Sequence, residues 1–177
     1  HLGEVTYFSP LADTSLPDAG FVYLPGGYPE LYLAALSANR QMLQSIRRYV
    51  ESGGKLLAEC GGMMYLCDEI RDKNGYVYPM AGVLHQSATM ENMKLRLGYR
   101  TLLYNETCLK GHEFHYSRLV EQQNPLPSCA VAYTAKGVET DTPLYHYKNV
   151  WAGYTHLYWA DPVGNEWFTK FVIDGNT

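Results

Sequence analysis

The sequence predicts an α/β protein of three layers, in which a mostly parallel sheet carries antiparallel additions. Two observations lead to this prediction. Before Gly75, short strand-like runs alternate with helical segments, which is typical of βαβ units in a parallel sheet. After Gly75, strand-like segments follow one another with turns between them, which indicates antiparallel pairing. Because the chain has 177 residues and no internal repeat or linker, we expect one domain over residues 1–177.

The first part of the chain contains three expected strands and a clear helix. Residues 4–8 alternate and are rich in β-forming residues, so they are expected to form a strand. Residues 21–24 and 55–59 are short buried-type runs, the pattern of strands covered on both faces. Between these runs, Asn39 is a suitable N-cap and Gly53 a suitable stop for a helix. The apolar residues of that helix fall on one stripe: Met42, Leu43, Ile46, Tyr49 and Val50.

The second half is expected to contain strands joined by turns. The strand-like segments lie around residues 94–104, 112–120, 129–135 and 144–154. Turn-forming residues separate them at 124–125, 136–137 and 141–143. A short amphipathic segment over residues 165–173 is expected to form a closing helix.

The most informative stretch surrounds Cys60, between a predicted strand and a predicted helix. This order is typical of a nucleophile elbow, a strained turn that needs neighbours with little or no side chain. Ala58, Gly61 and Gly62 meet that need, and a thiol at a helix N-terminus is favoured as thiolate. Alternatively, Cys60 is a buried structural cysteine before a Gly-Gly turn. The local pattern alone leaves both readings open.

Backbone N–H groups near this turn can stabilise an oxyanion. The N–H of Gly61 directly follows the candidate nucleophile. The loop with Gly26 and Gly27 ends a neighbouring parallel strand, and the carboxyl ends of parallel strands face one crevice. We therefore expect Gly26 or Gly27 to complete an oxyanion hole, with a plain Pro-Gly-Gly turn as the alternative.

A thiol nucleophile needs a base that is close in the fold. His156 is the candidate, because it follows a strand-like run and precedes the helix-start signal at residues 161–162. For a single histidine a structural role is more frequent, and the pairing with Cys60 is what favours His156. His112 and His115 are three residues apart in a probable strand, so they face opposite sides and make a poor metal site.

The composition argues against several classes of protein. A net charge of −4 with scattered Lys and Arg does not indicate nucleic-acid binding. No apolar run is long enough to span a membrane, and no signal peptide is evident, so we expect a cytoplasmic protein without membrane contact. The cysteines show no CxxC spacing, so we expect no metal site.

Several runs of residues carry a resemblance to a known family. They are FSPLAD at 8–13, LPGGYPEL at 24–31, AECGGMMYL at 58–66, GYR at 98–100, GHEFHYS at 111–117 and GYTHL at 153–157. In this order they resemble cobyrinic acid a,c-diamide synthases over nearly the whole chain. The elbow alone is shared with many class I amidotransferases, whereas its combination with GGYPE and GHEFHYS is much more specific.

The resemblance implies a flavodoxin-like class I glutamine amidotransferase fold. It implies that Cys60 attacks the glutamine carboxamide to form a glutamyl thioester and that His156 transfers the proton. It implies that Gly27 and Gly61 are oxyanion donors, with Gly26 in the same glutamine-binding loop. It also implies that the chain requires no cofactor of its own.

The resemblance further implies partners for the glutaminase. Ammonia would pass to an ATP- and Mg²⁺-dependent synthetase domain of the same enzyme. That domain would amidate the a and c carboxylates of a corrinoid, cobyrinate or hydrogenobyrinate, in cobalamin synthesis. His112, Glu113 and His115 fall in a family signature, where we expect domain contact or an approach to the acceptor.

The sequence departs from the pattern of many class I amidotransferases in two ways. These enzymes place Glu two residues after the catalytic histidine, where this chain has Tyr158, so the third triad member is absent or comes from elsewhere. No GxxxxGK[ST] loop occurs, so we expect the ATP-binding domain to lie outside this chain. The first βα unit is also expected to be missing, which would leave the sheet without a strand near its centre.

Three other readings remain. A different thiol enzyme of the same superfamily would need Cys60 and His156 but no glutamine pocket. A catalytically inert module would only bind a partner synthetase. A third reading keeps the amidotransferase and changes the acceptor to nickel-sirohydrochlorin. The sequence does not determine the oligomeric state, and a homodimer stays open.

Overall fold

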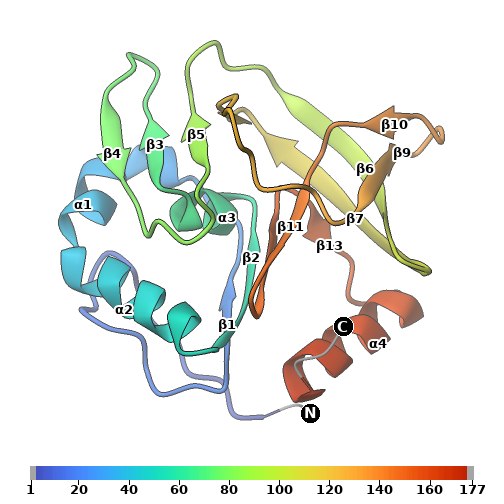
Figure 1. The fold of residues 1–177 in the computed structure, drawn as a ribbon, viewed down its shortest axis with the longest axis horizontal. Coiled ribbons are helices and arrows are strands. Elements are labelled where there is room, and N and C mark those ends of the chain that lie inside the picture. The colour runs from blue at the N-terminus through green and yellow to red at the C-terminus, as the bar shows by residue number, and fades with distance from the viewer. Residues whose placement is uncertain (1–2, 175–177) are drawn as a thin grey trace.

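The centre of the fold is a mixed sheet. The computed structural model describes residues 3–174. The strand order is β1-β2-β12-β11, in the centre of Figure 1. The strands are β1 (Phe21–Leu24), β2 (Lys55–Glu59), β11 (Leu144–Tyr147) and β12 (Val150–Gly153). β1, β2 and β12 are parallel, and β11 pairs antiparallel with β12. The prediction of a mostly parallel sheet with an antiparallel addition is confirmed.

Helices cover one face of this sheet (Figure 1). They are α1 (Leu33–Ala38), α2 (Arg40–Glu51) and α3 (Gly61–Leu66), with the 3-10 turn η1 (Pro29–Leu31) before them. The predicted ends of α2 are confirmed, because Asn39 Oδ1 accepts a hydrogen bond from Met42 N at 3.3 Å and Gly53 has φ 90°. The buried side of this layer is apolar and includes Met42, Ile46, Val50, Leu56 and Met63.

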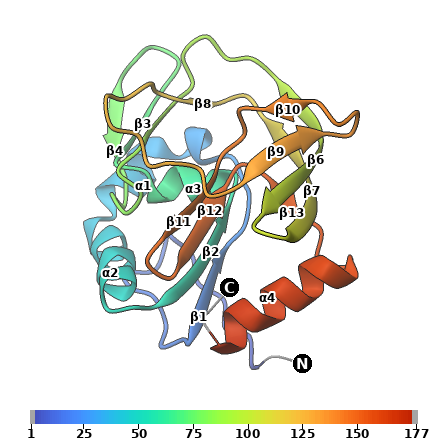
Figure 2. The ribbon, with the colours of Figure 1, turned by 45° about the vertical axis from the view of Figure 1, so that its right-hand side comes forward.

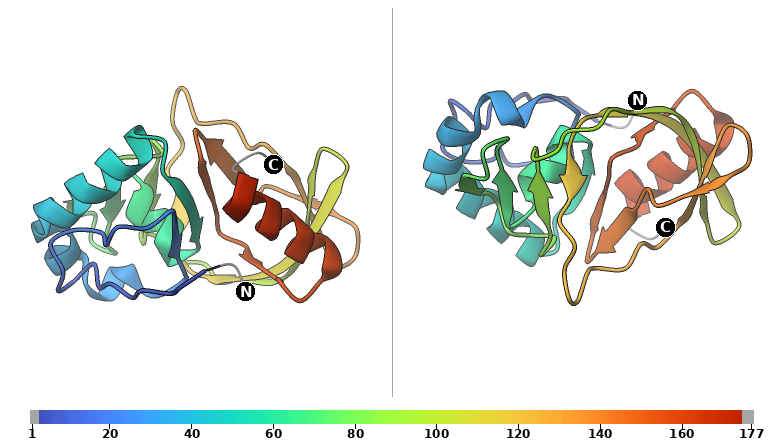
Figure 3. Two further views of the ribbon diagram at one scale, coloured as in Figure 1. Left: turned by 90° about the horizontal axis from the view of Figure 1, so that it is seen from below. Right: turned by 90° about the horizontal axis from the view of Figure 1, so that it is seen from above.

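Helix α4 (Pro162–Asp174) lies on the opposite face, so the sheet is sandwiched as Figure 3 shows from above and below. The predicted closing helix is confirmed, although it begins earlier, with Pro162 in its first turn. A second apolar cluster fills this layer and includes Leu57, Leu144, Trp151, Trp167 and Phe171. No helix within residues 3–174 is long and apolar enough to cross a membrane.

Two further sheets accompany the central one (Figure 2), and the first is antiparallel as expected of the second half, whereas the second is mixed because β3 and β5 pair parallel. One has the order β10-β9-β6-β7-β13, and all of its pairings are antiparallel. Its strands are β6 (Arg96–Tyr104), β7 (Thr107–His115), β9 (Val131–Thr134), β10 (Glu139–Thr140) and β13 (His156–Leu157). The other has the order β4-β3-β5-β8, from β3 (Glu69–Arg71), β4 (Val77–Pro79), β5 (Ser87–Thr89) and β8 (Arg118–Leu119).

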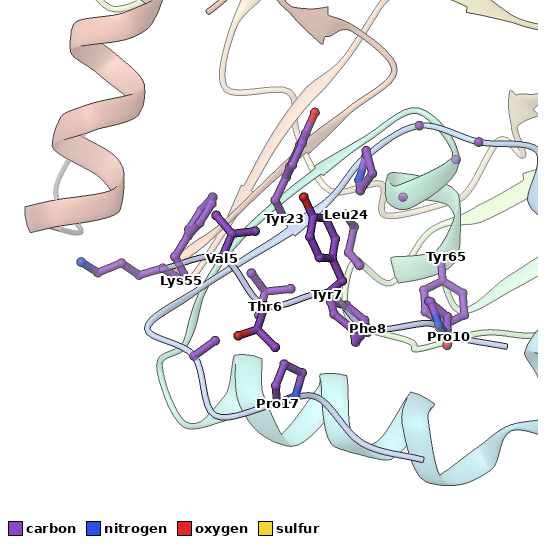
Figure 4. A pocket seen from close by; sticks show the side chains of 18 of the residues that line it. Val5, Thr6, Tyr7, Phe8, Pro10, Pro17, Tyr23, Leu24, Lys55 and Tyr65 are labelled. Atoms are coloured by element: carbon purple, nitrogen blue, oxygen red, sulfur yellow. The ribbon is translucent and has the colours of Figure 1, made fainter. Parts of the chain in front are cut away.

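The strand predicted over residues 4–8 is wrong, because this segment has no strand assignment. Its side chains are largely exposed, with Val5 at 72% and Tyr7 at 91%. An alternating pattern forms a strand only where a neighbouring strand accepts its backbone hydrogen bonds. Figure 4 shows this segment across a cavity of about 1200 Å³ from Tyr23 and Leu24 of β1. The expectation that a βα unit is missing stays a prediction.

Candidate active site

Cys60 occupies the predicted sharp turn between β2 and α3. Its backbone has φ 49° and ψ −108°, a conformation that residues other than glycine rarely adopt. The turn is held at both ends, since Cys60 N donates to Gly153 O at 2.8 Å and Met64 N donates to Cys60 O at 3.0 Å. The strand, sharp turn and helix of an elbow are therefore confirmed.

The predicted glycines converge on this turn. A Cβ on Gly61 would lie 2.7 Å from Gly27 O and 3.0 Å from Gly27 N, so the two backbones approach closely. A Cβ on Gly26 would lie 2.2 Å from Cε1 of His156. The structure thus brings Gly26, Gly27 and Gly61 to the same place as Cys60 and His156.

His156 begins β13 and presents its imidazole to the elbow. Its pKa is raised to about 9, first by a hydrogen bond with Cys60 and then by one with Glu59, and these outweigh the opposing effect of burial. The imidazole is therefore positively charged at neutral pH and next to the thiol. A basic imidazole beside a thiol is the arrangement in which cysteine acts as a nucleophile.

Glu59 is a part of the site that sequence reasoning missed. Its Oε2 lies 3.5 Å from His156 Nδ1, and its Oε1 accepts from Leu157 N at 3.0 Å. Tyr23 Oη donates to Oε2 at 2.6 Å. A carboxylate therefore lies beside His156, and it belongs to the residue before Cys60. The available signal was an acidic residue at the end of a buried strand, where a charge needs partners.

The histidines of β7 divide between its two faces, as their spacing predicts. His112 is exposed and stacks on His156, with ring centroids 5.1 Å apart and an angle of 22° between the rings. Glu113 and His115 are buried, and Glu113 Oε2 lies 2.9 Å from Arg100 Nη2. Domain contact or approach to the acceptor stays a prediction for His112. The interior positions of Glu113 and His115 do not fit direct contact with another domain.

The remaining thiols lack these neighbours. Cys67 is buried in the core, and desolvation raises the pKa of its thiol. Burial also raises the pKa of Cys129 to about 11, and Cys108 is exposed. Within the described range, no group of three or more His, Cys, Asp or Glu side chains could hold a metal ion. The arrangement around Cys60 is suited to nucleophilic chemistry at a carbonyl or carboxamide carbon.

The chain resembles known proteins over most of its length. The chain is 39% identical over 163 residues to a cobyrinate a,c-diamide synthase of Fusobacterium nucleatum, covering 88% of this chain and 35% of that protein. It is 38% identical over 160 residues to a hydrogenobyrinate a,c-diamide synthase of Pseudomonas aeruginosa, with the same two coverages. The chain therefore spans about a third of the length of these curated relatives.

A solved structure shows the same fold. It is described as a crystal structure of glutamine amidotransferase, with a TM-score of 0.57 at 18% sequence identity. The match covers 86% of this chain and 78% of the other, and it supports the predicted flavodoxin-like class I architecture. Residues 1–163 match the family described as the CobB/CobQ-like glutamine amidotransferase domain. The chain therefore belongs to the family of CobB/CobQ-like glutamine amidotransferase domains.

Proposed function

We propose that this chain hydrolyses glutamine, with Cys60 as nucleophile and His156 as general acid and base. The observation that carries the proposal is the placement of the His156 imidazole beside the Cys60 thiol, on an elbow of strained backbone that Gly26 and Gly27 approach. Membership in a glutamine amidotransferase family supports glutamine as the substrate. Gly27 and Gly61, whose backbones meet at the elbow, are the proposed oxyanion donors.

The proposed reaction proceeds through a thioester. The Cys60 sulfur forms a bond with the side-chain carbonyl carbon of glutamine, and the carbonyl oxygen becomes an oxyanion. When this intermediate collapses, the C–N bond breaks and His156 gives its proton to the nitrogen, which leaves as ammonia. His156 then takes a proton from water, whose oxygen attacks the thioester. The C–S bond breaks, releasing glutamate and restoring the thiolate.

The proposed role of this reaction is to supply ammonia to a synthetase. The relatives are named cobyrinate and hydrogenobyrinate a,c-diamide synthases, and each is about three times as long as the matched region. We therefore propose that the ammonia amidates carboxylates of such a corrinoid in an ATP- and Mg²⁺-dependent synthetase domain. No step assigned to this chain uses ATP or Mg²⁺.

Labelling with a glutamine-like electrophile tests the glutaminase proposal. The chain is treated with a chloroketone analogue of glutamine, with and without excess glutamine, and adducts are mapped by mass spectrometry. We expect an adduct on Cys60 that glutamine suppresses and that His156→Ala greatly slows. Cys60→Ala should also abolish release of ammonia from glutamine.

Cys108 supplies an internal control, because its thiol is exposed and belongs to no candidate site. A simple haloacetamide should label Cys108 whether or not glutamine is present. Labelling of Cys60 that glutamine does not suppress, in a chain shown to be folded by circular dichroism, would contradict a glutamine pocket. It would favour a thiol enzyme with another substrate.

A further inference from the structure

The carboxylate of Glu59 is buried beside the proposed base. It ends β2 with 3% of the residue exposed, and burying a carboxylate costs free energy unless donors or positive charges surround it. Leu157 N donates a hydrogen bond to Oε1. Tyr23 Oη donates to Oε2 at 2.6 Å, and His156 Nδ1 lies 3.5 Å from the same oxygen. These partners therefore stabilise the buried negative charge, and they hold the carboxylate against Nδ1 of the imidazole.

We propose that Glu59 is the positioning residue for His156, with Tyr23 holding the carboxylate in place. Because Nδ1 faces Glu59, Nε2 is the nitrogen left for the Cys60 thiol. A carboxylate in this position fixes the tautomer and the ring orientation of a catalytic histidine and stabilises its cation. The catalytic meaning of this role rests on the proposed glutamine hydrolysis, but the orientation of the ring does not.

Tyr23 is suited to hold Glu59 because it remains a donor. It lies on β1, which runs parallel to β2. Burial, followed by the hydrogen bond and the negative charge of Glu59, raises the pKa of the Tyr23 phenol, and a hydrogen bond from Trp159 opposes this only in part. The phenol is thus protonated throughout the neutral range. Its short contact with Oε2 does not depend on pH there.

The groups that face His156 determine how its charge depends on pH. They are Cys60 from the elbow, Glu59 from β2 and His112 from β7. The pKa of His156 is raised from 6.5 to about 9. These contacts therefore add stability that is fully present below pH 6.5 and is lost as the pH rises through about 9. When Cys60 is replaced by Ser, Glu59 is the anion that remains beside the ring.

An NMR titration of the His156 imidazole in Cys60→Ser tests the proposal without requiring activity. Adding Glu59→Gln, which keeps the shape of the side chain, should lower the pKa of His156 by about one pH unit or more. The nitrogen shifts should show loss of the single tautomer protonated at Nδ1. Glu106→Gln is the control, since it removes an exposed carboxylate at the turn between β6 and β7 and should leave this titration unchanged. An unchanged pKa in Glu59→Gln would overturn the proposal.

Tyr23→Phe is a second variant in case Glu59→Gln does not fold. This substitution removes the hydrogen bond from Tyr23 to Glu59 Oε2 but keeps the aromatic ring in place. The pKa of His156 should therefore change when Tyr23→Phe is combined with Cys60→Ser. The proposal is overturned if a folded Tyr23→Phe leaves both the pKa and the tautomer of His156 unaltered.

Kinetics with Cys60 intact separate this proposal from the glutaminase proposal. Glu59→Gln should lower kcat by about 10²- to 10⁴-fold with little change in KM, as loss of an orienting carboxylate does elsewhere. Failure of glutamine to protect Cys60 overturns the glutaminase alone. An unaltered His156 titration overturns the positioning role alone, even if the chain hydrolyses glutamine.

Discussion

At the scale of single residues, the backbone of Cys60 is the feature on which the site depends. A conformation of this kind costs about 1–3 kcal/mol and persists only where the surroundings enforce it. Hydrogen bonds to Gly153 O and from Met64 N enforce it here. In this conformation Cys60 stands at the start of α3 with its buried sulfur 3.9 Å from Phe114 O.

Gly26→Ala should disable the site by displacing His156. The new Cβ would lie 2.2 Å from Cε1 of the imidazole, so the ring must move. A displacement of about 1 Å can cost about 10²-fold in rate, and we expect a loss of this size in the kcat of glutamine hydrolysis. Gly20→Ala is the control, because nothing lies within 4 Å of its Cβ. A folded Gly26→Ala chain with normal kcat would refute the assigned place of His156.

At the scale of elements, β7 connects the surface of the site to the interior. Its residues alternate, so His112 and Phe114 face outward while Glu113 and His115 face inward. The backbone of β7 borders the nucleophile, since Cys60 Sγ lies 3.9 Å from Phe114 O. The inward face meets Arg100 of β6 through Glu113. Charge inside this sheet therefore supports the strand that lines the thiol.

Glu113→Gln should destabilise the chain by about 3–5 kcal/mol at pH 7, because it leaves the guanidinium of Arg100 buried without this counter-charge. Burial raises the pKa of Glu113, but contacts with His115 and Thr142 and the charge of Arg100 lower it overall. A lowered pKa gives stability that is present above the usual value of about 4.3 and is lost as the pH falls through the folded value.

Urea unfolding of Glu113→Gln at pH 7 and at acid pH checks this dependence. The difference in the free energy of unfolding between Glu113→Gln and the unsubstituted chain should become smaller as the pH falls. Glu106→Gln, at an exposed turn between β6 and β7, should change stability by less than about 0.5 kcal/mol. An equal deficit at both pH values would show that the charge of Glu113 is not responsible.

At the scale of the whole molecule, the central sheet divides two apolar clusters. α1, α2 and α3 enclose one cluster, and α4 encloses the other (Figure 3). The elbow stands at the end of β2, between the two, so both layers hold it. Lys55 also links β2 to α4, because its Nζ donates to Val172 O and Ile173 O at 2.8 Å each.

Phe171→Ala should therefore lower the free energy of unfolding by about 3–5 kcal/mol, because Phe171 of α4 is fully buried between this helix and the sheet. Its ring packs edge-on against Phe21 of β1, at 5.7 Å between centroids. Ile173→Ala on the exposed side of the same helix should cost less than about 0.5 kcal/mol. Similar losses in the two variants, measured by chemical unfolding, would contradict this role for α4.

Local sequence was sufficient to predict the elbow and α2. The small residues around Cys60 and the N-cap Asn39 act on residues next to them in the chain. The elbow and the start of α2 could therefore be predicted from local sequence. Residues 4–8 could not, because a strand needs a partner that an alternating pattern does not specify. Glu59 was missed for a similar reason. Its bond with Leu157 joins positions 98 residues apart, which the fold alone brings together.

The placement of the tryptophans gives the molecule a built-in optical reporter. All three, Trp151, Trp159 and Trp167, lie on the α4 side, with Trp167 packed edge-on against Trp151 and stacked with Trp159. Tryptophan fluorescence, excited selectively over tyrosine, therefore reports mainly on that layer and little on the layer of α2 and α3. Cys67 is buried in the other layer, so exposure of its thiol reports there. Together the two signals show whether the layers separate in one step or in sequence.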